Sequence, residues 1–137
     1  MPFVVDNSVV SGWYIKEQAT PYTAAILARL KNDSAHVPAL WLLELANVAR
    51  TSVIRGKFTP EQATDAVILM TKLPITVDRA EVSADALFAL ALKYDLSSYD
   101  AAYLDLAIRL ELPIAAKDGA LRKAAEAAGL GVVALMC

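Results

Sequence analysis

Apolar residues occur along this chain in short unbroken runs that alternate with longer stretches of helical spacing. The first run, residues 3–5, is β-branched and aromatic and ends at Asp6. Such a run, closed by a polar residue, predicts a buried strand that leads into a turn or a helix cap. Other short segments with extended or strand-like character are residues 36–38, 74–77, 113–116 and 131–135.

Longer stretches between these runs place apolar residues three and four positions apart, which predicts helices. A short helix is expected after Asp6, with a break before Pro21. Thr20 is then a cap and Pro21 the first residue of the next helix. Gly56 and Pro74 interrupt the pattern as breakers. The expected helices cover residues 22–30, 39–54, 60–72, 79–94, 99–110 and about 119–128.

Short apolar strands that alternate with helices predict a parallel sheet covered on both faces. The expected fold class is therefore α/β, a three-layer α/β/α sandwich with a mostly parallel central sheet. No repeat, low-complexity stretch or linker divides the chain, so residues 1–137 are expected to form a single domain. Ligands of such sheets bind beyond the carboxyl ends of the strands, so polar residues there are the first candidates for function.

Composition limits the class of protein further. With 137 residues, 57% of them apolar, the chain can fold without disulfides, and its single cysteine, Cys137, fits a reducing, cytoplasmic setting. The start lacks a basic leader, and the longest apolar run, residues 86–92, is too short to cross a membrane. The net charge of −2 does not attract polyanions, so a nucleic acid needs a local basic patch.

Four acidic residues stand at positions where ligands are expected. Asp6 and Asp118 follow strand-like runs, and Asp100 lies in the first turn of an expected helix. Glu44 lies inside residues 40–46, which are otherwise apolar, so its carboxylate is expected to be buried or to line a cleft. Taken singly, each aspartate also fits an ordinary helix cap or capping box.

Taken together, these acids predict a metal site. Neither Arg50 nor Arg55 has the spacing to pair with Glu44 along a helix, and four crowded carboxylates would repel one another. Hard oxygen ligands of this kind suit Mg²⁺ or Mn²⁺ and point to metal-dependent hydrolysis of phosphodiesters. Asp105 is about 140° from Asp100 on a helix and is expected to face elsewhere. Since His36 is the only histidine, a ribonuclease mechanism with two histidines is excluded.

The residues around these acids resemble the PIN-domain nucleases, in particular the VapC-type ribonuclease toxins of bacterial toxin–antitoxin pairs. The resemblance covers essentially the whole chain and is carried by residues 4–8, 43–48, 98–104 and 117–121 in this order. It implies a PIN-like fold, in which Asp6, Glu44, Asp100 and Asp118 hold Mg²⁺ or Mn²⁺ and the Ser8 hydroxyl supports these ligands. It also implies RNA as the substrate, an antitoxin as the partner and a homodimer.

Contact with RNA is expected from local basic and aromatic residues, among which Arg50, Lys117 and Tyr99 are the main candidates. Arg55, Lys57, Lys93, Arg122 and Lys123 are further candidates. Two other interpretations remain. The chain could be a receiver-like binding module, although Asp6 is not followed by a second acid. It could also be a catalytically degenerate PIN-like module, because Ala116 stands where the resembled family often has a hydroxyl residue.

Surplus apolar residues predict self-association. Two expected helices have more apolar surface than one small sheet is expected to cover. The residues concerned are 24–27 in one helix and Val48, Val53 and Ile54 in the other. We expect a homodimer through these helices. We also expect a groove for an antitoxin segment that places an Arg or Lys near the four acids.

Overall fold

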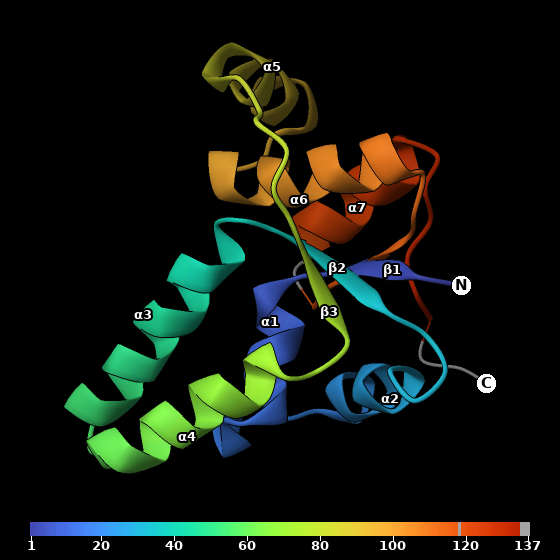
Figure 1. Cartoon of the computed structure of the whole chain (residues 1–137). Helices are drawn as coiled ribbons and strands as arrows, with labels where there is room; N and C mark the ends of the chain where they lie inside the picture. Colours follow the sequence, from blue (N-terminus) through green and yellow to red (C-terminus); the bar gives the residue numbers. More distant parts are fainter. Residues whose placement is uncertain (118, 135–137) are drawn as a thin grey trace.

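The computed structural model describes residues 1–117 and 119–134, in which four short strands form one parallel sheet (Figure 1). Strand order is β3-β2-β1-β4, so the first strand of the chain lies inside the sheet. The α/β class and the parallel sheet predicted from the sequence are confirmed. The strands are β1 (Phe3–Val5), β2 (Ala35–Pro38), β3 (Ile75–Asp78) and β4 (Ile114–Ala115).

Register aligns the carboxyl ends of the strands. Val5 pairs with Ala115, and Pro38 of β2 pairs with Asp78 of β3. Because every pairing is parallel, the residues that follow each strand emerge at the same edge of the sheet. Asp6 is one of them, and its backbone N–H donates to Ala115 O at 2.9 Å.

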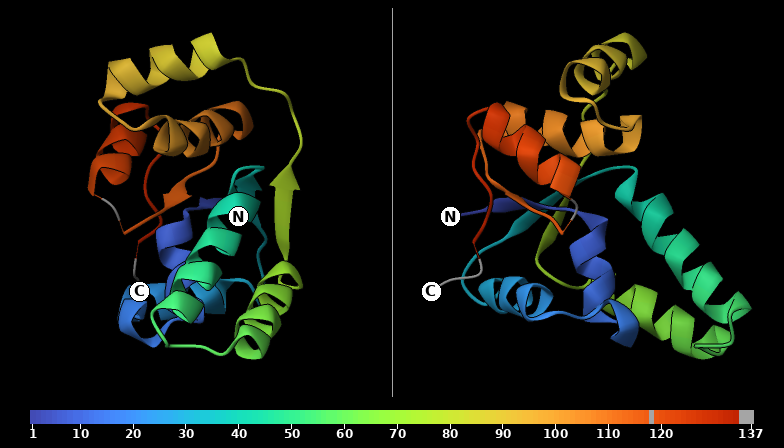
Figure 2. Two further views of the ribbon diagram at one scale, coloured as in Figure 1. Left: turned by 90° about the vertical axis from the view of Figure 1, so that its left-hand side faces the viewer. Right: turned by 180° about the vertical axis from the view of Figure 1, so that it is seen from behind.

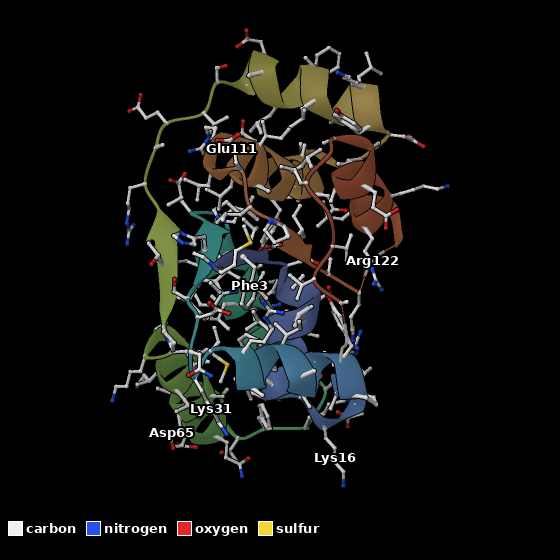
Figure 3. All side chains as sticks on the ribbon, turned by 90° about the vertical axis from the view of Figure 1, so that its right-hand side faces the viewer. Phe3, Lys16, Lys31, Asp65, Glu111 and Arg122 are labelled. Carbon is white, nitrogen blue, oxygen red and sulfur yellow. The ribbon has the colours of Figure 1, made fainter. Side chains whose placement is uncertain are left out.

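Alternation along β1 divides the core into two halves, one on each face of the sheet. Phe3 and Val5 pack among buried residues of the early helices, whereas Val4 packs against α6 and α7. Figures 1 and 2 show α1 and α2 on one side of the sheet and α6 and α7 on the other. In Figure 3, Phe3 lies in the interior, while Lys16 and Lys31 lie at the periphery.

Caps fix most helix ends where the sequence predicts them. Thr20 and Thr59 form capping boxes with proline at the start of the following helix, and Ser97 caps the helix that carries Asp100. The helices are α1 (Asn7–Val10), α2 (Pro21–Arg29), α3 (Trp41–Ile54), α4 (Pro60–Thr71), α5 (Ala84–Tyr94), α6 (Ser98–Leu110) and α7 (Gly119–Ala127), with 3₁₀ turns η1 (Ser11–Trp13) and η2 (Lys16–Gln18).

Two predicted elements differ from the structure. The helix expected over residues 79–94 begins only at Ala84, because Asp78 still belongs to β3 and the Ser83 hydroxyl caps the helix by accepting from Ala86 N. The strand expected over residues 131–135 is, within the described residues, a single bridge between Val132 and Ile114. Position 135 lies outside the described residues.

Apolar side chains reach the surface on one of the two helices expected to carry them, and also on α5. Ile26 of α2 is completely buried, so the expected dimer surface on that helix is wrong at this residue. Leu43 and Ile54 of α3 are largely exposed, and so are Phe88 and Leu92 of α5, a helix without one fully buried residue. None of the described helices is both long and apolar enough to span a bilayer.

Candidate active site

Asp6 occupies the turn from β1 into α1 at the carboxyl edge of the sheet. It is 6% exposed, and as the N-cap of α1 it accepts from Ser8 N at 3.4 Å. The Ser8 hydroxyl donates to Asp6 Oδ2 at 2.5 Å and accepts from Lys117 N at 3.3 Å. Ser8 therefore ties the carboxylate of Asp6 to the segment that follows β4.

Glu44 lies early in α3 and is half-buried, in the environment that its apolar neighbours predict. Its Oε1 accepts a hydrogen bond of 2.5 Å from the hydroxyl of Tyr103, which is completely buried in α6. This bond joins α6 to α3 and fixes the position of one carboxylate oxygen of Glu44. A second carboxylate oxygen remains for other ligands, because a carboxylate offers two acceptor atoms.

Electrostatics show that Asp6, Glu44 and Tyr103 converge. Burial raises the pKa of the Glu44 carboxyl, the bond from Tyr103 opposes this shift, and the negative charge of Asp6 adds to it. Burial also raises the pKa of the Tyr103 hydroxyl, and the charges of Glu44 and Asp6 act in the same direction. Tyr103 therefore stays protonated and donates its hydrogen bond, while the two carboxylates repel each other.

Asp100 stands one helical turn before Tyr103 on the same face of α6. The Ser97 hydroxyl accepts from Asp100 N at 3.1 Å, which holds the start of the helix at this position. Asp118, the fourth predicted acid, lies outside the described residues. Within residues 1–117 and 119–134, no three acidic, histidine or cysteine side chains form a group that could hold a metal ion.

The donors that do converge are chemically suited to a hard divalent cation. Two carboxylates that repel each other, supported by the hydroxyls of Ser8 and Tyr103, are ligands and ligand supports of the kind that Mg²⁺ and Mn²⁺ prefer. A cation would offset the repulsion between Asp6 and Glu44, which adds to the effect of burial on the pKa of Glu44.

The three residues predicted to contact RNA lie in different surroundings. Tyr99 is 63% exposed beside Asp100. Lys117 turns its Nζ toward Gln18 and donates to that carbonyl oxygen at 2.9 Å. Arg50 is exposed on α3 and lines a groove of about 640 Å³ between α3 and α4 that is otherwise mostly apolar.

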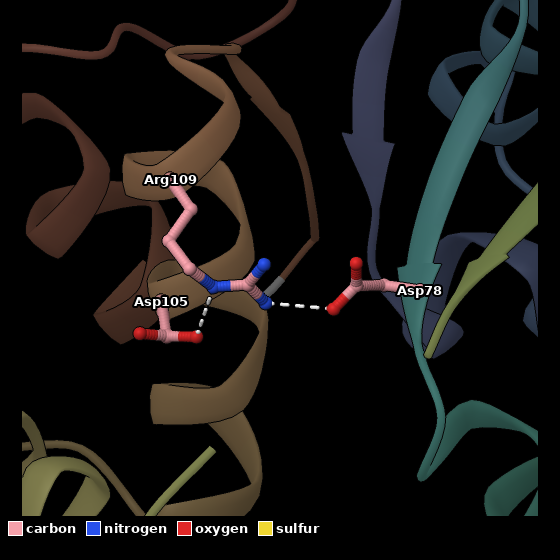
Figure 4. Close-up of polar contacts among 3 residues, drawn as sticks. All are labelled: Asp78, Asp105 and Arg109. Atoms are coloured by element: carbon pink, nitrogen blue, oxygen red, sulfur yellow. Dashed lines mark hydrogen bonds and ion pairs between the residues drawn. The ribbon is translucent and has the colours of Figure 1, made fainter. Parts of the chain in front are cut away.

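Tyr103 was not among the predicted site residues, although the sequence carries a signal. Its position three residues after Asp100 places it on the same helical face, and a buried phenol hydroxyl needs a polar partner. Asp78, another acid at the carboxyl end of a strand, was not among the predicted site residues either. Arg109 donates to Asp78 at 2.7 Å and to Asp105 at 2.9 Å (Figure 4). Asp105 therefore belongs to this second group of charges.

Comparison with known proteins identifies the family. A family model described as "PIN domain" matches residues 3–127, which include Asp6, Glu44 and Asp100. No curated protein matches the chain. On the strength of a match over most of its length, the chain belongs to the PIN domain family, whose members are generally metal-dependent nucleases.

Proposed function

We propose that this protein is a Mg²⁺- or Mn²⁺-dependent endoribonuclease that hydrolyses RNA phosphodiester bonds with a water molecule as nucleophile. One observation carries the proposal. Glu44, half-buried and held by the hydroxyl of Tyr103, lies near enough to Asp6 for the charge of Asp6 to add to the rise in the pKa of Glu44 that burial causes. Carboxylates held together in this way are costly without a cation.

Each residue has a distinct role in this proposal. Asp6, Glu44, Asp100 and Asp118 would hold the metal. When bound, the metal polarises the phosphoryl oxygens and lowers the pKa of a water molecule. The Ser8 hydroxyl fixes the orientation of Asp6, and the Tyr103 hydroxyl fixes that of Glu44.

Metal dependence and product chemistry test the proposal. We expect the purified protein to cleave RNA with Mg²⁺ or Mn²⁺, to stop in excess chelator, and to leave 5′-phosphate and 3′-hydroxyl ends. Undiminished cleavage in chelator, or 2′,3′-cyclic phosphate products, would contradict the mechanism. RNA that is bound but never cleaved under any metal condition would favour the catalytically degenerate module instead.

A role as the toxin of a toxin–antitoxin pair is the finer part of the proposal. It is supported by apolar side chains that the described chain leaves at the surface, among them Ile54 of α3, Leu69 of α4 and Phe88 of α5. We propose that such surfaces take a second copy of the chain and an antitoxin segment, whose Arg or Lys would neutralise the acids in place of metal.

Two measurements test these partners. Light scattering at micromolar concentration is expected to give the mass of a dimer, and a strictly monomeric protein would contradict this part. With an antitoxin in hand, removal of its cation near the acids is expected to relieve inhibition. Inhibition that survives this change would contradict the proposed contact.

A further inference from the structure

Beyond Glu44, the same face of α3 continues to a basic residue at the end of the helix. Arg55 is eleven residues after Glu44, which places it about 20° around the helix axis and about 16 Å along it. Val48 and Thr51 lie on this face between them. A ligand bound at Glu44 that extends along α3 therefore reaches Arg55.

Arg55 borders a hollow between the second half of α3 and the turns η1 and η2. This hollow has a volume of about 290 Å³. A second hollow of about 250 Å³ adjoins it and shares Ser52 and Lys57 with it. Side chains with polar groups line the first hollow: Ser11, Gln18, Thr51, Ser52, Arg55 and Lys57.

Contacts within the chain hold the wall opposite α3 in place. The indole N–H of Trp13 donates to Thr23 O at 2.7 Å, which ties η1 to α2. The Ser11 hydroxyl donates to Ser8 O at 3.2 Å, and Lys117 Nζ donates to Gln18 O. The wall is therefore connected to Ser8 and Lys117 beside Asp6, and the hollow is preformed rather than opened by a ligand.

Polar groups around these hollows carry more positive than negative charge, although the whole chain has a net charge of −2. Lys16, Arg55 and Lys57 stand against one acid, Glu17, which lies 3.1 Å from Lys57 Nζ. In the part of the chain that the structure describes, Arg55 has no ion pair and the buried Tyr14 Oη has no hydrogen-bond partner. Donors are thus available to an anion.

We propose that this hollow binds a backbone phosphate of the nucleic-acid strand that passes over the acidic site, with Arg55 as the main phosphate ligand. The inference rests on the proposed function, because that function supplies the strand. A metal ion offsets the charge of only the phosphate at the carboxylates, so neighbouring phosphates need cations of their own. A guanidinium binds phosphate through two parallel hydrogen bonds. Lys57 is the second cation, and its ion pair with Glu17 is replaced by an ion pair with the phosphate.

Arg50 provides a matched control on the same helix. Both arginines are exposed side chains of the same charge, but Arg50 is about 120° away from Glu44 around the axis of α3. It lines the apolar groove toward α4, not the polar hollow. If only the total charge matters, replacing either arginine by alanine weakens nucleic-acid binding equally. If the hollow binds a phosphate, only the replacement of Arg55 weakens binding.

The experiment measures binding without cleavage. A fluorescent single-stranded RNA and a DNA of the same sequence are titrated with the full chain in excess chelator, by anisotropy, from about 50 mM to about 300 mM salt. We expect Arg55→Ala to weaken binding of both strands about fivefold to tenfold at low salt and to reduce the salt slope by about 0.7. Arg50→Ala is expected to behave as wild type, and Arg55→Lys to keep the slope.

Several outcomes would overturn the inference. These are equal effects of Arg55→Ala and Arg50→Ala, an unchanged salt slope in Arg55→Ala, or a wild-type protein that binds neither strand. Binding that depends on Arg55 in a protein that never cleaves RNA would support the phosphate site and contradict the proposed nuclease activity. Thermal melts of the two alanine variants detect a folding defect, and Arg55→Gln, which also removes the charge, retains the test if Arg55→Ala is unstable.

Discussion

Two groups of carboxylates stand at the carboxyl edge of this sheet, and their surroundings are opposite. In one, Asp78 and Asp105 flank Arg109, whose pKa is raised chiefly by its hydrogen bond to Asp78 and further by that to Asp105 (Figure 4). In the other, hydroxyl groups donate to Asp6 and Glu44, and the pKa of Glu44 is raised. The first group is neutralised by a cation of the chain itself, whereas in the second, burial and the charge of Asp6 raise the pKa of Glu44.

This difference shows that an acid at a strand end is not by itself a candidate for catalysis. Asp6 and Asp78 both mark the carboxyl end of a parallel strand, and Asp100 and Asp105 share one helix. In each pair, Arg109 compensates the charge of the second member, Asp78 or Asp105. Paired variants at these positions therefore test the assignment directly.

The largest effect is expected at the strand ends. Asp6→Asn keeps an acceptor that can cap α1 but removes a proposed metal ligand. We expect cleavage to fall by more than about 100-fold, beyond the loss typical of residues that only orient a ligand. Asp78→Asn is expected to leave the cleavage rate unchanged. Rates of RNA cleavage at saturating Mg²⁺ measure both, and equal losses would contradict the comparison.

A similar contrast is expected within α6. Asp100→Asn should abolish cleavage while the metal-free protein is at least as stable as wild type, because a repulsive charge is lost. Asp105→Asn should retain cleavage and lose about 0.2–1 kcal/mol of unfolding free energy with its partly exposed ion pair. Urea unfolding and cleavage assays check both variants. An Asp100→Asn protein that is inactive because it fails to fold would show that Asp100 is only a helix-start residue.

An intermediate effect is expected at the hydroxyl that holds Glu44. Tyr103→Phe keeps the buried ring and removes the donor to Oε1. We expect cleavage and Mn²⁺ affinity to fall together by about 10–100-fold. Tyr94→Phe removes a phenol hydroxyl from another helix, α5, and serves as the control. Unchanged Mn²⁺ affinity in Tyr103→Phe, measured by calorimetry, would show that Tyr103 does not position Glu44.

The smallest effect is a pH dependence of stability in the metal-free protein. Because burial raises the pKa of Glu44 above its ordinary value of 4.5, the folded state keeps a proton that the unfolded state has released just above that pH. The contribution of Glu44 to unfolding free energy therefore falls as pH rises through this window. Glu44→Gln is expected to remove this part of the slope. Urea unfolding from about pH 4.5 to about pH 8 measures it, and parallel curves for both proteins would contradict it.

The fold was largely predictable because local signals agree with tertiary packing. The β-branched run ending at Asp6 and the capped helix starts at Thr20 and Ser97 have, in the folded chain, the structure that their local sequence predicts. The start of α5 was not predictable in this way. Residues 79–83 have helical spacing, but they must cover the distance from β3 to α5, and only tertiary structure imposes that demand.

For the candidate site, the sequence indicated which acids to consider but not what surrounds them. That Glu44 is half-buried followed from its apolar neighbours, whereas its bond to Tyr103, 59 residues away in sequence, depends on how the fold places α3 and α6. Likewise, the pairing of Asp78 with Arg109 joins positions 31 residues apart. Spacing along a single helix cannot predict such contacts, because they arise from topology.

The exposed position of α5 has a consequence for how the molecule opens. Among the described elements, α6 is the one against which α5 packs extensively, and none of the residues of α5 is fully buried (Figure 2). Little apolar area holds it in place, so its local opening costs less free energy than global unfolding. In native-state hydrogen exchange, amides of α5 should therefore exchange earlier than those of α6. A partner that covers Phe88 and Leu92 would be recognised by the protection it gives to these amides.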